Sequence, residues 1–97
     1  MEYNNLPILS ALGQPTRWRA FALLIAHGPE GLLQGEIARS LSIEKNLMST
    51  HLKIMREAGL VAARREGRKV TYIATPAATR YVAQRIVELI DREAALA

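Results

Sequence analysis

Apolar residues recur every three to four positions over most of the chain, which is the spacing of one face of an α-helix. Five segments have this pattern, and Pro15, Gly28 and Pro76 stand where helices are expected to begin or end. The predicted helices are residues 6–12, 15–27, 34–41, 44–58 and 76–93. In the second of them, the predicted apolar stripe consists of Trp18, Phe21, Ala22 and Ile25, with Leu24 beside them.

The segment from Glu44 to Gly59 divides most clearly into two faces. At about 100° per residue, its polar side chains fall within one arc of roughly 140°. They are Lys45, Asn46, Ser49, Thr50, Lys53, Arg56 and Glu57. The opposite arc holds Leu47, Met48, His51, Leu52, Ile54 and Met55. One face is therefore expected to be buried, and the other has amides, hydroxyls and cations that suit a nucleic-acid groove.

Only Ser42, Ile43 and Glu44 separate this helix from the one before it, so residues 34–58 are predicted to form a helix-turn-helix. Residues 61–74 then change to a period of two, which indicates a β-hairpin, and Leu32 and Leu33 are too few for more than a strand stub.

The predicted hairpin turns at Glu66 and Gly67. This register places Arg65 opposite Arg68, and Arg64 opposite Lys69. Like charges opposite one another are destabilising, so the hairpin is expected to meet an anion. The alternative is a splayed, solvated tip.

The two outer helices, residues 6–12 and 76–93, have more apolar surface than a small domain needs. They are expected to pack against a second copy of the chain. The predicted dimer interface consists of Leu6, Leu9, Tyr81, Val82, Ile86, Leu89 and Ile90. The fold class is therefore mainly α with a small β-hairpin, and residues 1–97 are expected to form one domain of a homodimer.

Composition narrows the classes of protein. No apolar run reaches the 18 or more residues that a membrane span needs, and the N-terminus lacks the basic and apolar regions of a signal peptide. Without cysteine, disulfides and thiolate metal ligands are excluded. A cytoplasmic protein, associated with the nucleoid when bound to DNA, is expected.

The net charge of +4 is concentrated in the middle of the chain. Between Gln34 and Tyr72 there are eight cations against four anions, and each flanking segment is neutral. A local basic region in a small domain indicates a polyanionic partner.

Catalysis is not expected. The two histidines are His27, at a helix end, and His51, which on an apolar arc is more often a satisfied core residue than a ligand or base. No phosphate-binding glycine loop and no cluster with metal-ligand spacing is present in the sequence, so no cofactor and no metal site are predicted.

The cations and hydrogen-bonding groups instead divide into two roles. Base reading is assigned to Lys45, Asn46, Ser49, Thr50 and Lys53. Contacts to the DNA backbone, from helices and hairpin, are assigned to Arg17, Arg19, Arg56, Arg64, Arg65, Arg68 and Lys69. For Arg17 and Arg19 a solvated helix end is an equal alternative. Glu44 and Glu57 oppose phosphate binding, unless they accept from a cytosine amino group.

Four motifs follow one another along the chain: A-L-G-Q-P-T-R-W-R (Ala11 to Arg19), G-E-I-A-R-S-L-S-I (Gly35 to Ile43), S-T-H-L-K-I-M-R-E-A-G-L-V (Ser49 to Val61) and R-R-E-G-R-K-V-T-Y (Arg64 to Tyr72). Together they resemble the ArsR/SmtB family of bacterial winged-helix repressors, over nearly the whole chain. The resemblance implies a winged helix-turn-helix, with residues 61–74 as the wing and a dimer contact through the outer helices.

By the same resemblance, Ser49 and Thr50 are the base-reading pair and His51 is an inward histidine. The chain departs from the metal sensors of this family, because the helix at 34–41 has no cysteine and the last helix has no histidine. Metal sensing through those sites is therefore not expected. Glu44 and Gln14 also stand where a better helix cap is common.

These observations predict a dimeric transcriptional repressor that binds an inverted repeat in double-stranded DNA. Two alternatives remain open. One is a winged-helix module that binds an acidic protein instead of DNA. The other is a repressor that responds to an unidentified small molecule, bound between the outer helices near Trp18 and Tyr81.

Overall fold

The computed structural model describes residues 5–96. Residues 1–4, part of the N-terminus considered above for a signal peptide, and residue 97 lie outside this range. The elements are α1 (Asn5–Leu12), α2 (Pro15–His27), the 3-10 helix η1 (Gly28–Glu30), β1 (Leu32–Leu33), α3 (Gln34–Leu41), α4 (Lys45–Ala58), β2 (Val61–Glu66), β3 (Lys69–Ala74) and α5 (Pro76–Leu96). The predicted class, mainly α with a helix-turn-helix and a hairpin, is confirmed.

The ends of α2 show how local sequence sets the helix boundaries. The Gln14 side-chain oxygen accepts from the Arg17 backbone N–H at 2.9 Å. Gln14 therefore caps the N-terminus of α2, as a shorter residue such as serine or aspartate commonly does. Pro15 occupies the first helical position, where its missing N–H costs nothing. At the other end, Gly28 has a φ of 60°, a conformation that favours glycine.

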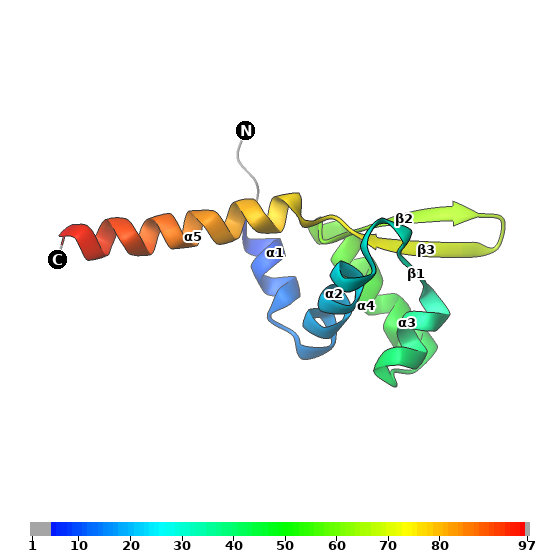
Figure 1. Ribbon diagram of the computed structural model, residues 1–97. Coiled ribbons are helices and arrows are strands. Elements are labelled where there is room, and N and C mark those ends of the chain that lie inside the picture. Colours follow the sequence, from blue (N-terminus) through cyan, green and yellow to red (C-terminus); the bar gives the residue numbers. More distant parts are fainter. Residues whose placement is uncertain (1–4, 97) are drawn as a thin grey trace.

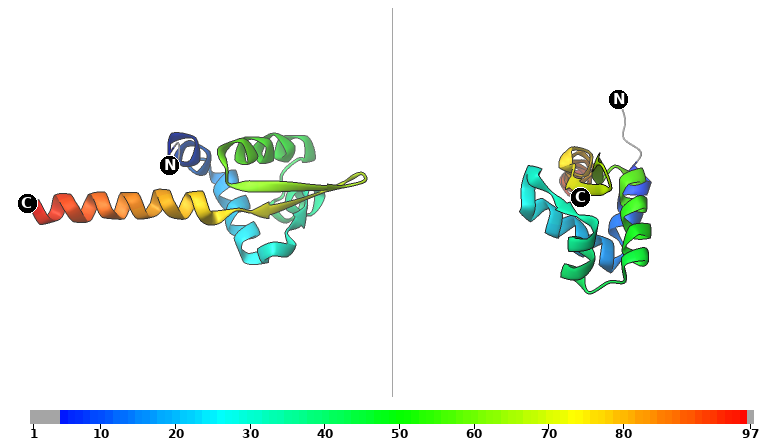
Figure 2. Two further views of the ribbon diagram at one scale, coloured as in Figure 1. Left: turned by 90° about the horizontal axis from the view of Figure 1, so that it is seen from above. Right: turned by 90° about the vertical axis from the view of Figure 1, so that its right-hand side faces the viewer.

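The helices form one body from which two arms project (Figure 1). In that body α1 packs against α2 and α4, and α3 packs against α4 and α2. The β2–β3 hairpin extends from one end of the body and α5 extends from the other, as the left view in Figure 2 also shows. The molecule consequently measures 54 × 25 × 21 Å.

The sheet has three antiparallel strands in the order β1, β3, β2. The predicted stub at Leu32 and Leu33 is β1, and it pairs with Tyr72 and Thr71 of β3. This pairing connects the middle of β3 to the residues that directly precede α3.

The turn of the hairpin lies one residue later than predicted. Glu66 pairs with Lys69, and Arg65 pairs with Val70, so the two-residue loop is Gly67 and Arg68. Gly67 has a φ of 63°. Ser42 is the one non-glycine with positive φ among the described residues, so the second loop residue, Arg68, has a negative φ. Positive φ at the first loop residue alone is the arrangement of a type II′ turn, which requires glycine there. The predicted facing of like charges is therefore wrong, because this register sets Glu66 opposite Lys69.

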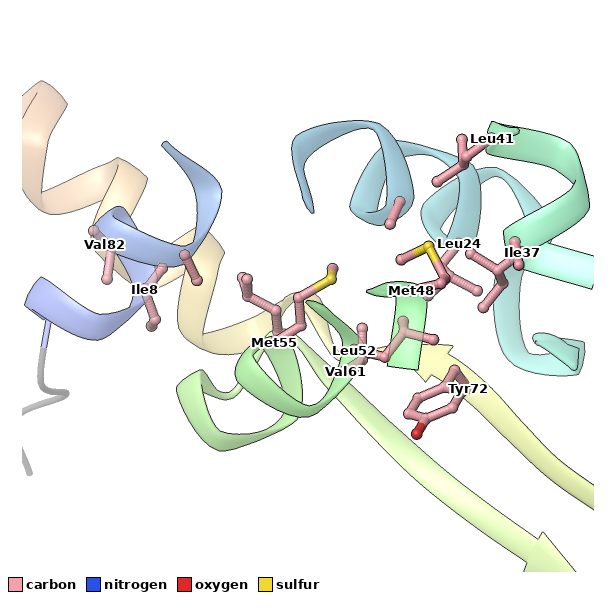
Figure 3. Close-up of a cluster of buried hydrophobic side chains, with 14 residues drawn as sticks. Ile8, Leu24, Ile37, Leu41, Met48, Leu52, Met55, Val61, Tyr72 and Val82 are labelled. Atoms are coloured by element: carbon pink, nitrogen blue, oxygen red, sulfur yellow. The ribbon is translucent and has the colours of Figure 1, made fainter. Parts of the chain in front are cut away.

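One cluster of buried apolar side chains holds the body together (Figure 3). Its fully buried members include Leu24 of α2, Ile37 of α3, Leu60, and three residues of α4. Figure 3 shows Ile8 of α1 and Val82 of α5 beside each other at one end of the cluster.

The predicted apolar stripe of α2 is confirmed for Leu24, which is buried, and for Phe21, which packs partly buried against the core, but it is wrong for its other three members. Ala20 and Leu24 are the buried residues of this helix, whereas Trp18 is 61% exposed and Ile25 is also exposed. The physical reason is that α1, α3 and α4 all pack against α2, and the small Ala20 lets them approach closely. Periodicity alone could not choose between two faces that both contain apolar residues.

The α5 helix buries little of its own apolar surface. Val82 is only 2% exposed, so its assignment to the dimer interface is corrected: it already packs in the core of its own chain. The other large aliphatic residues assigned to this interface are exposed, namely Leu6, Leu9, Ile86, Leu89 and Ile90. Tyr81 is half-buried. None of the helices in the described part of the chain is long and apolar enough to cross a membrane.

Candidate nucleic-acid interface

The α4 helix is fixed at both ends by its own neighbours. The Glu44 carboxylate accepts from the backbone N–H groups of Asn46, at 2.8 Å, and Leu47, at 3.2 Å. Its negative charge also interacts favourably with the positive, N-terminal end of the helix dipole. At the other end Gly59 adopts a φ of 87°, and the Leu60 N–H donates to the Met55 carbonyl. The helix therefore begins and ends almost where the sequence predicts.

The buried face of α4 is narrower than predicted. Met48, Leu52 and Met55 are completely buried, so one row of side chains anchors the helix. Leu47 is 50% exposed and Ile54 is also exposed, so their predicted burial is wrong. They extend beyond the surface that α1, α2, α3 and β2 cover. An exposed leucine beside hydrogen-bonding groups can make apolar contact with a thymine methyl group.

The outward face of α4 carries the predicted base-reading groups. Lys45, Asn46, Thr50 and Lys53 are exposed and Ser49 is half-buried. The Thr50 hydroxyl donates to the Asn46 carbonyl at 3.3 Å, which leaves its oxygen lone pairs and the Asn46 side-chain amide to face a partner. The Glu44 carboxylate, in contrast, is engaged with the helix N-terminus.

The turn between α3 and α4 is held by Ser42, whose φ of 56° is left-handed. Its N–H donates to the Arg39 carbonyl at 3.2 Å, and the Ile43 N–H donates to the Ala38 carbonyl at 3.0 Å. These bonds close the C-terminus of α3 and set the angle at which α4 leaves it. The sequence predicted the turn from its length but not this conformation.

The hairpin presents its cations to solvent. Arg65, Arg68 and Lys69 are exposed, whereas Arg64 forms an ion pair with Glu66 at 3.5 Å. Both members of that pair are largely exposed, so it adds little to stability. It does reduce the charge that Arg64 offers to an anion.

Arg17 lies where α1, α2 and α4 meet. Its Nε donates to the Ala11 carbonyl at 2.8 Å, and its Nη1 lies 3.1 Å from Nδ1 of His51. Because a guanidinium only donates, Nδ1 of His51 accepts and the ring proton resides on Nε2. Burial, and then the charge of Arg17, lower the pKa of His51 below its usual 6.5. His51 is thus inward and half-buried, as a satisfied neutral residue.

The remaining cations differ in their surroundings. Arg19 is exposed and its Nη2 approaches the Leu41 carbonyl at 3.4 Å, and Arg56 is exposed near the C-terminus of α4. Sequence reasoning missed Arg39, an exposed residue of α3 whose Nη1 lies 3.4 Å from the position that a Cβ on Gly35 would take. The available signal was its outward position on the predicted 34–41 helix, within the basic middle of the chain.

Two other kinds of site find no support in the described residues. No group of three or more His, Asp or Glu side chains that could hold a metal ion occurs among residues 5–96. The ligand site suggested between Trp18 and Tyr81 is also unsupported within one protomer, because Trp18 is exposed on the surface of α2.

A helix-turn-helix whose second helix presents a polar face beside a basic hairpin is a winged helix-turn-helix domain. The family model that matches the chain is that of the MarR family, over residues 14–69. Because this match covers more than half of the chain, the protein belongs to the MarR family.

The sequence of the chain is similar to that of the HTH-type transcriptional regulator Rv2034 of Mycobacterium tuberculosis. The two are 41% identical over 66 residues, which is 68% of this chain and 59% of that regulator. The match thus spans less than two thirds of the length of this relative.

Solved structures place the fold among ArsR-type regulators, and the predicted resemblance to that group is confirmed. An ArsR-like transcriptional regulator from Rhodococcus sp. RHA1 has a TM-score of 0.76 and 26% identity, covering 95% of this chain and 87% of its own. A second similar structure is the homodimeric winged helix-turn-helix DNA-binding domain of Mb0332 from Mycobacterium bovis, a possible ArsR-family regulator. It has a TM-score of 0.68 and 27% identity, covering 90% of this chain and 77% of its own.

Proposed function

We propose that this protein is a sequence-specific, DNA-binding transcriptional repressor that acts as a homodimer in the cytoplasm. The observation that carries the proposal is the exposed face of α4, where Asn46 and Thr50 present short hydrogen-bonding groups next to a basic wing. Such groups suit base edges in the major groove, which is wide enough to admit an α-helix. A transcriptional regulator as sequence relative, and a DNA-binding domain as structural relative, support the same function.

Within this proposal, α4 enters the major groove, and Asn46, Ser49, Thr50 and Lys53 read bases. Arg56 and the wing cations contact the phosphate backbone or the neighbouring minor groove. Arg17 is a weaker candidate for the backbone, because two of its nitrogens already bond within the chain.

Dimerisation is proposed through the apolar faces of α1 and α5. Leu89 is 49% exposed, and Leu6, Ile86 and Ile90 are also exposed apolar residues of these two helices. Large apolar side chains left exposed on two helices favour a site of association. A two-fold dimer reads an inverted repeat, with half-sites separated by about one helical turn of DNA or a multiple of it. Repression would follow from occlusion of a promoter that contains this repeat.

The proposal is tested by measuring duplex affinity at several salt concentrations. Each phosphate-binding cation is expected to contribute about −0.9 to the slope of log K against log salt. The wild-type protein first selects a duplex from a random pool. Affinity is then measured for the selected duplex and for a duplex with a scrambled version of the same sequence. A flat salt response, or equal affinity for selected and scrambled duplexes, would overturn the proposal.

The division of roles needs a second comparison. Thr50→Ala is expected to reduce the preference for the selected duplex over the scrambled one, because it removes a hydrogen bond to a base. Arg65→Ala is expected to weaken both duplexes alike. Identical behaviour of the two variants would contradict the division. Tight binding to acidic proteins with no binding to either duplex would favour the protein-interaction alternative.

A further inference from the structure

A shallow groove lies where the start of α4, the N-terminus of α3 and the wing come together. Lys45 of α4, Gln34 and Gly35 of α3, and Arg68 and Lys69 of the hairpin all line it. A second depression continues from it along α3 and shares Gly35 and Lys45.

The groove gathers positive charge that the described part of the chain does not neutralise. Lys45, Arg68 and Lys69 are exposed, and the ion pairs found among residues 5–96 involve other cations, Arg64 and Arg85. Arg39 adds a fourth cation, which lines the adjoining depression. Like charges brought together in this way repel one another unless an anion lies between them.

The acidic residues nearby are engaged elsewhere. The Glu36 carboxylate accepts from the Leu33 N–H at 2.8 Å, which draws it back to cap α3. Glu66 pairs with Arg64 at 3.5 Å. Gly35 has no side chain, so the first turn of α3, where backbone N–H groups lack helical partners, is open to the groove.

The position of the groove indicates which anion fits it. In duplex DNA, one sugar-phosphate strand separates the major groove from the adjacent minor groove. If α4 occupies the first and the wing reaches the second, that strand must cross the surface between α4 and the wing. The basic groove is lined by residues of α4 and of the wing and therefore lies on this surface.

We infer that Lys45, Arg68 and Lys69, with Arg39 beside them, hold the phosphates of the strand that separates the two DNA grooves. This inference rests on the proposed function and deepens it. It also reassigns Lys45, which the sequence pattern placed among the base-reading residues, to the DNA backbone. The clamp fixes how far α4 enters the major groove, since it is built partly on the first residue of that helix.

The test combines neutral phosphates with a protein variant. Wild-type protein is bound to the selected duplex and to versions in which one phosphate at a time is replaced by an uncharged methylphosphonate. One or two positions on the strand between the grooves are expected to weaken binding, each by about tenfold. In the Lys45→Gln, Arg68→Gln double variant, which keeps Lys69 and Arg39, the same methylphosphonates are expected to weaken binding clearly less than in the wild-type protein.

The matched control is Arg85→Gln, Arg92→Gln, which removes two exposed cations from α5. It should retain the wild-type penalty at every methylphosphonate position. Circular dichroism of both double variants, whose substitutions lie on the surface, checks that the fold is retained.

Two results would overturn the inference. The first is a Lys45→Gln variant that changes the preference for selected over scrambled duplex while keeping every methylphosphonate penalty, which would return Lys45 to base reading. The second is an unchanged methylphosphonate profile in the Lys45→Gln, Arg68→Gln variant. Failure of the proposed function looks different, because the wild-type protein would then select no duplex at all.

Discussion

The α4 and α5 helices are both amphipathic, yet they use their apolar faces in different ways. Of the 14 residues of α4, Met48, Leu52 and Met55 are completely buried within the chain. Of the 21 residues of α5, Val82 alone is buried, although Ile86, Leu89 and Ile90 continue its apolar stripe. An amphipathic pattern therefore predicts that a face will be covered, but not whether the same chain covers it.

The ends of the two helices show the same contrast. In α4, the Glu44 side chain and the left-handed Gly59 fix both ends, so the polar face is held in one orientation relative to the core. In α5, the C-terminal half projects beyond the body (Figure 1). The proposed function requires a rigid helix that contacts DNA bases and a second helix whose apolar face remains free to bind another copy of the chain.

The largest expected effect comes from breaking the buried face of α4. Leu52→Ala removes a completely buried side chain and should lower the free energy of unfolding by about 2–5 kcal/mol. Urea denaturation at fixed protein concentration measures it. Leu47→Ala, at a half-exposed position on the same helix, is the matched control and should cost well under half as much. Similar losses for both variants would show that α4 is not anchored by one row alone.

The second effect concerns α5. It should change the free energy of dimerisation and not the free energy of folding of one chain. Leu89 is 49% exposed in one chain, so a dimer would bury about half of its side chain, twice by symmetry. Leu89→Ala should therefore cost roughly 2 kcal/mol of dimerisation free energy, which raises the dimer Kd about thirtyfold.

Sedimentation equilibrium measures that Kd. Gln84→Ala, at an exposed polar position of the same helix, should leave the Kd unchanged. A monomeric wild type, or equal Kd values for the two variants, would remove α5 from the dimer interface.

The third effect is the loss of the α4 cap. Glu44→Ala leaves two backbone N–H groups without their side-chain acceptor and should cost about 1 kcal/mol. Glu44→Gln keeps an acceptor but loses the charge at the helix N-terminus, so a smaller loss is expected. Glu57→Ala removes an exposed carboxylate from the last turn of the same helix, where its charge is unfavourable, and should cost nothing. Thermal unfolding of the three variants measures these losses. The prediction is contradicted if Glu44→Ala does not lose the most stability or if Glu57→Ala loses as much as Glu44→Gln.

The smallest effect tests the contact between α4 and α2 through pH. The pKa of His51 is lowered in the folded state, so below pH 6.5 the unfolded chain takes up a proton first. Stability is thus at its full value above pH 6.5 and falls as the pH drops below it. His51→Gln should reduce this dependence between pH 7.5 and 5.5. Denaturation curves that keep the wild-type slope in His51→Gln would exclude this linkage.

Local signals explain why most helices could be predicted. Periodicity, Pro15 at a first helical position and Gly59 directly after a last one are read within a few residues, and α3 and α4 begin and end within one residue of expectation. The hairpin was predicted, but its turn was displaced because glycine at the second loop position was assumed. Recognition that Gly67 alone needs a positive φ would have given the observed register.

The candidate interface was predicted in part. The outward groups of α4 and the wing cations could be found from the sequence, since both lie on one element with a regular period. The groove that joins Lys45 to Arg68 could not, because more than twenty positions separate the two residues along the chain.

The sequence by itself determined the helices, the hairpin, the polar face of α4 and the excess of positive charge, since each depends on neighbours along the chain. Only the tertiary structure decided that α2 buries Ala20 and leaves Trp18 exposed, that Val82 belongs to the core of its own chain, and that cations of α4 and of the hairpin share one groove. Those outcomes depend on which surfaces meet when the elements pack, and contacts between distant segments leave no periodic trace in a single sequence.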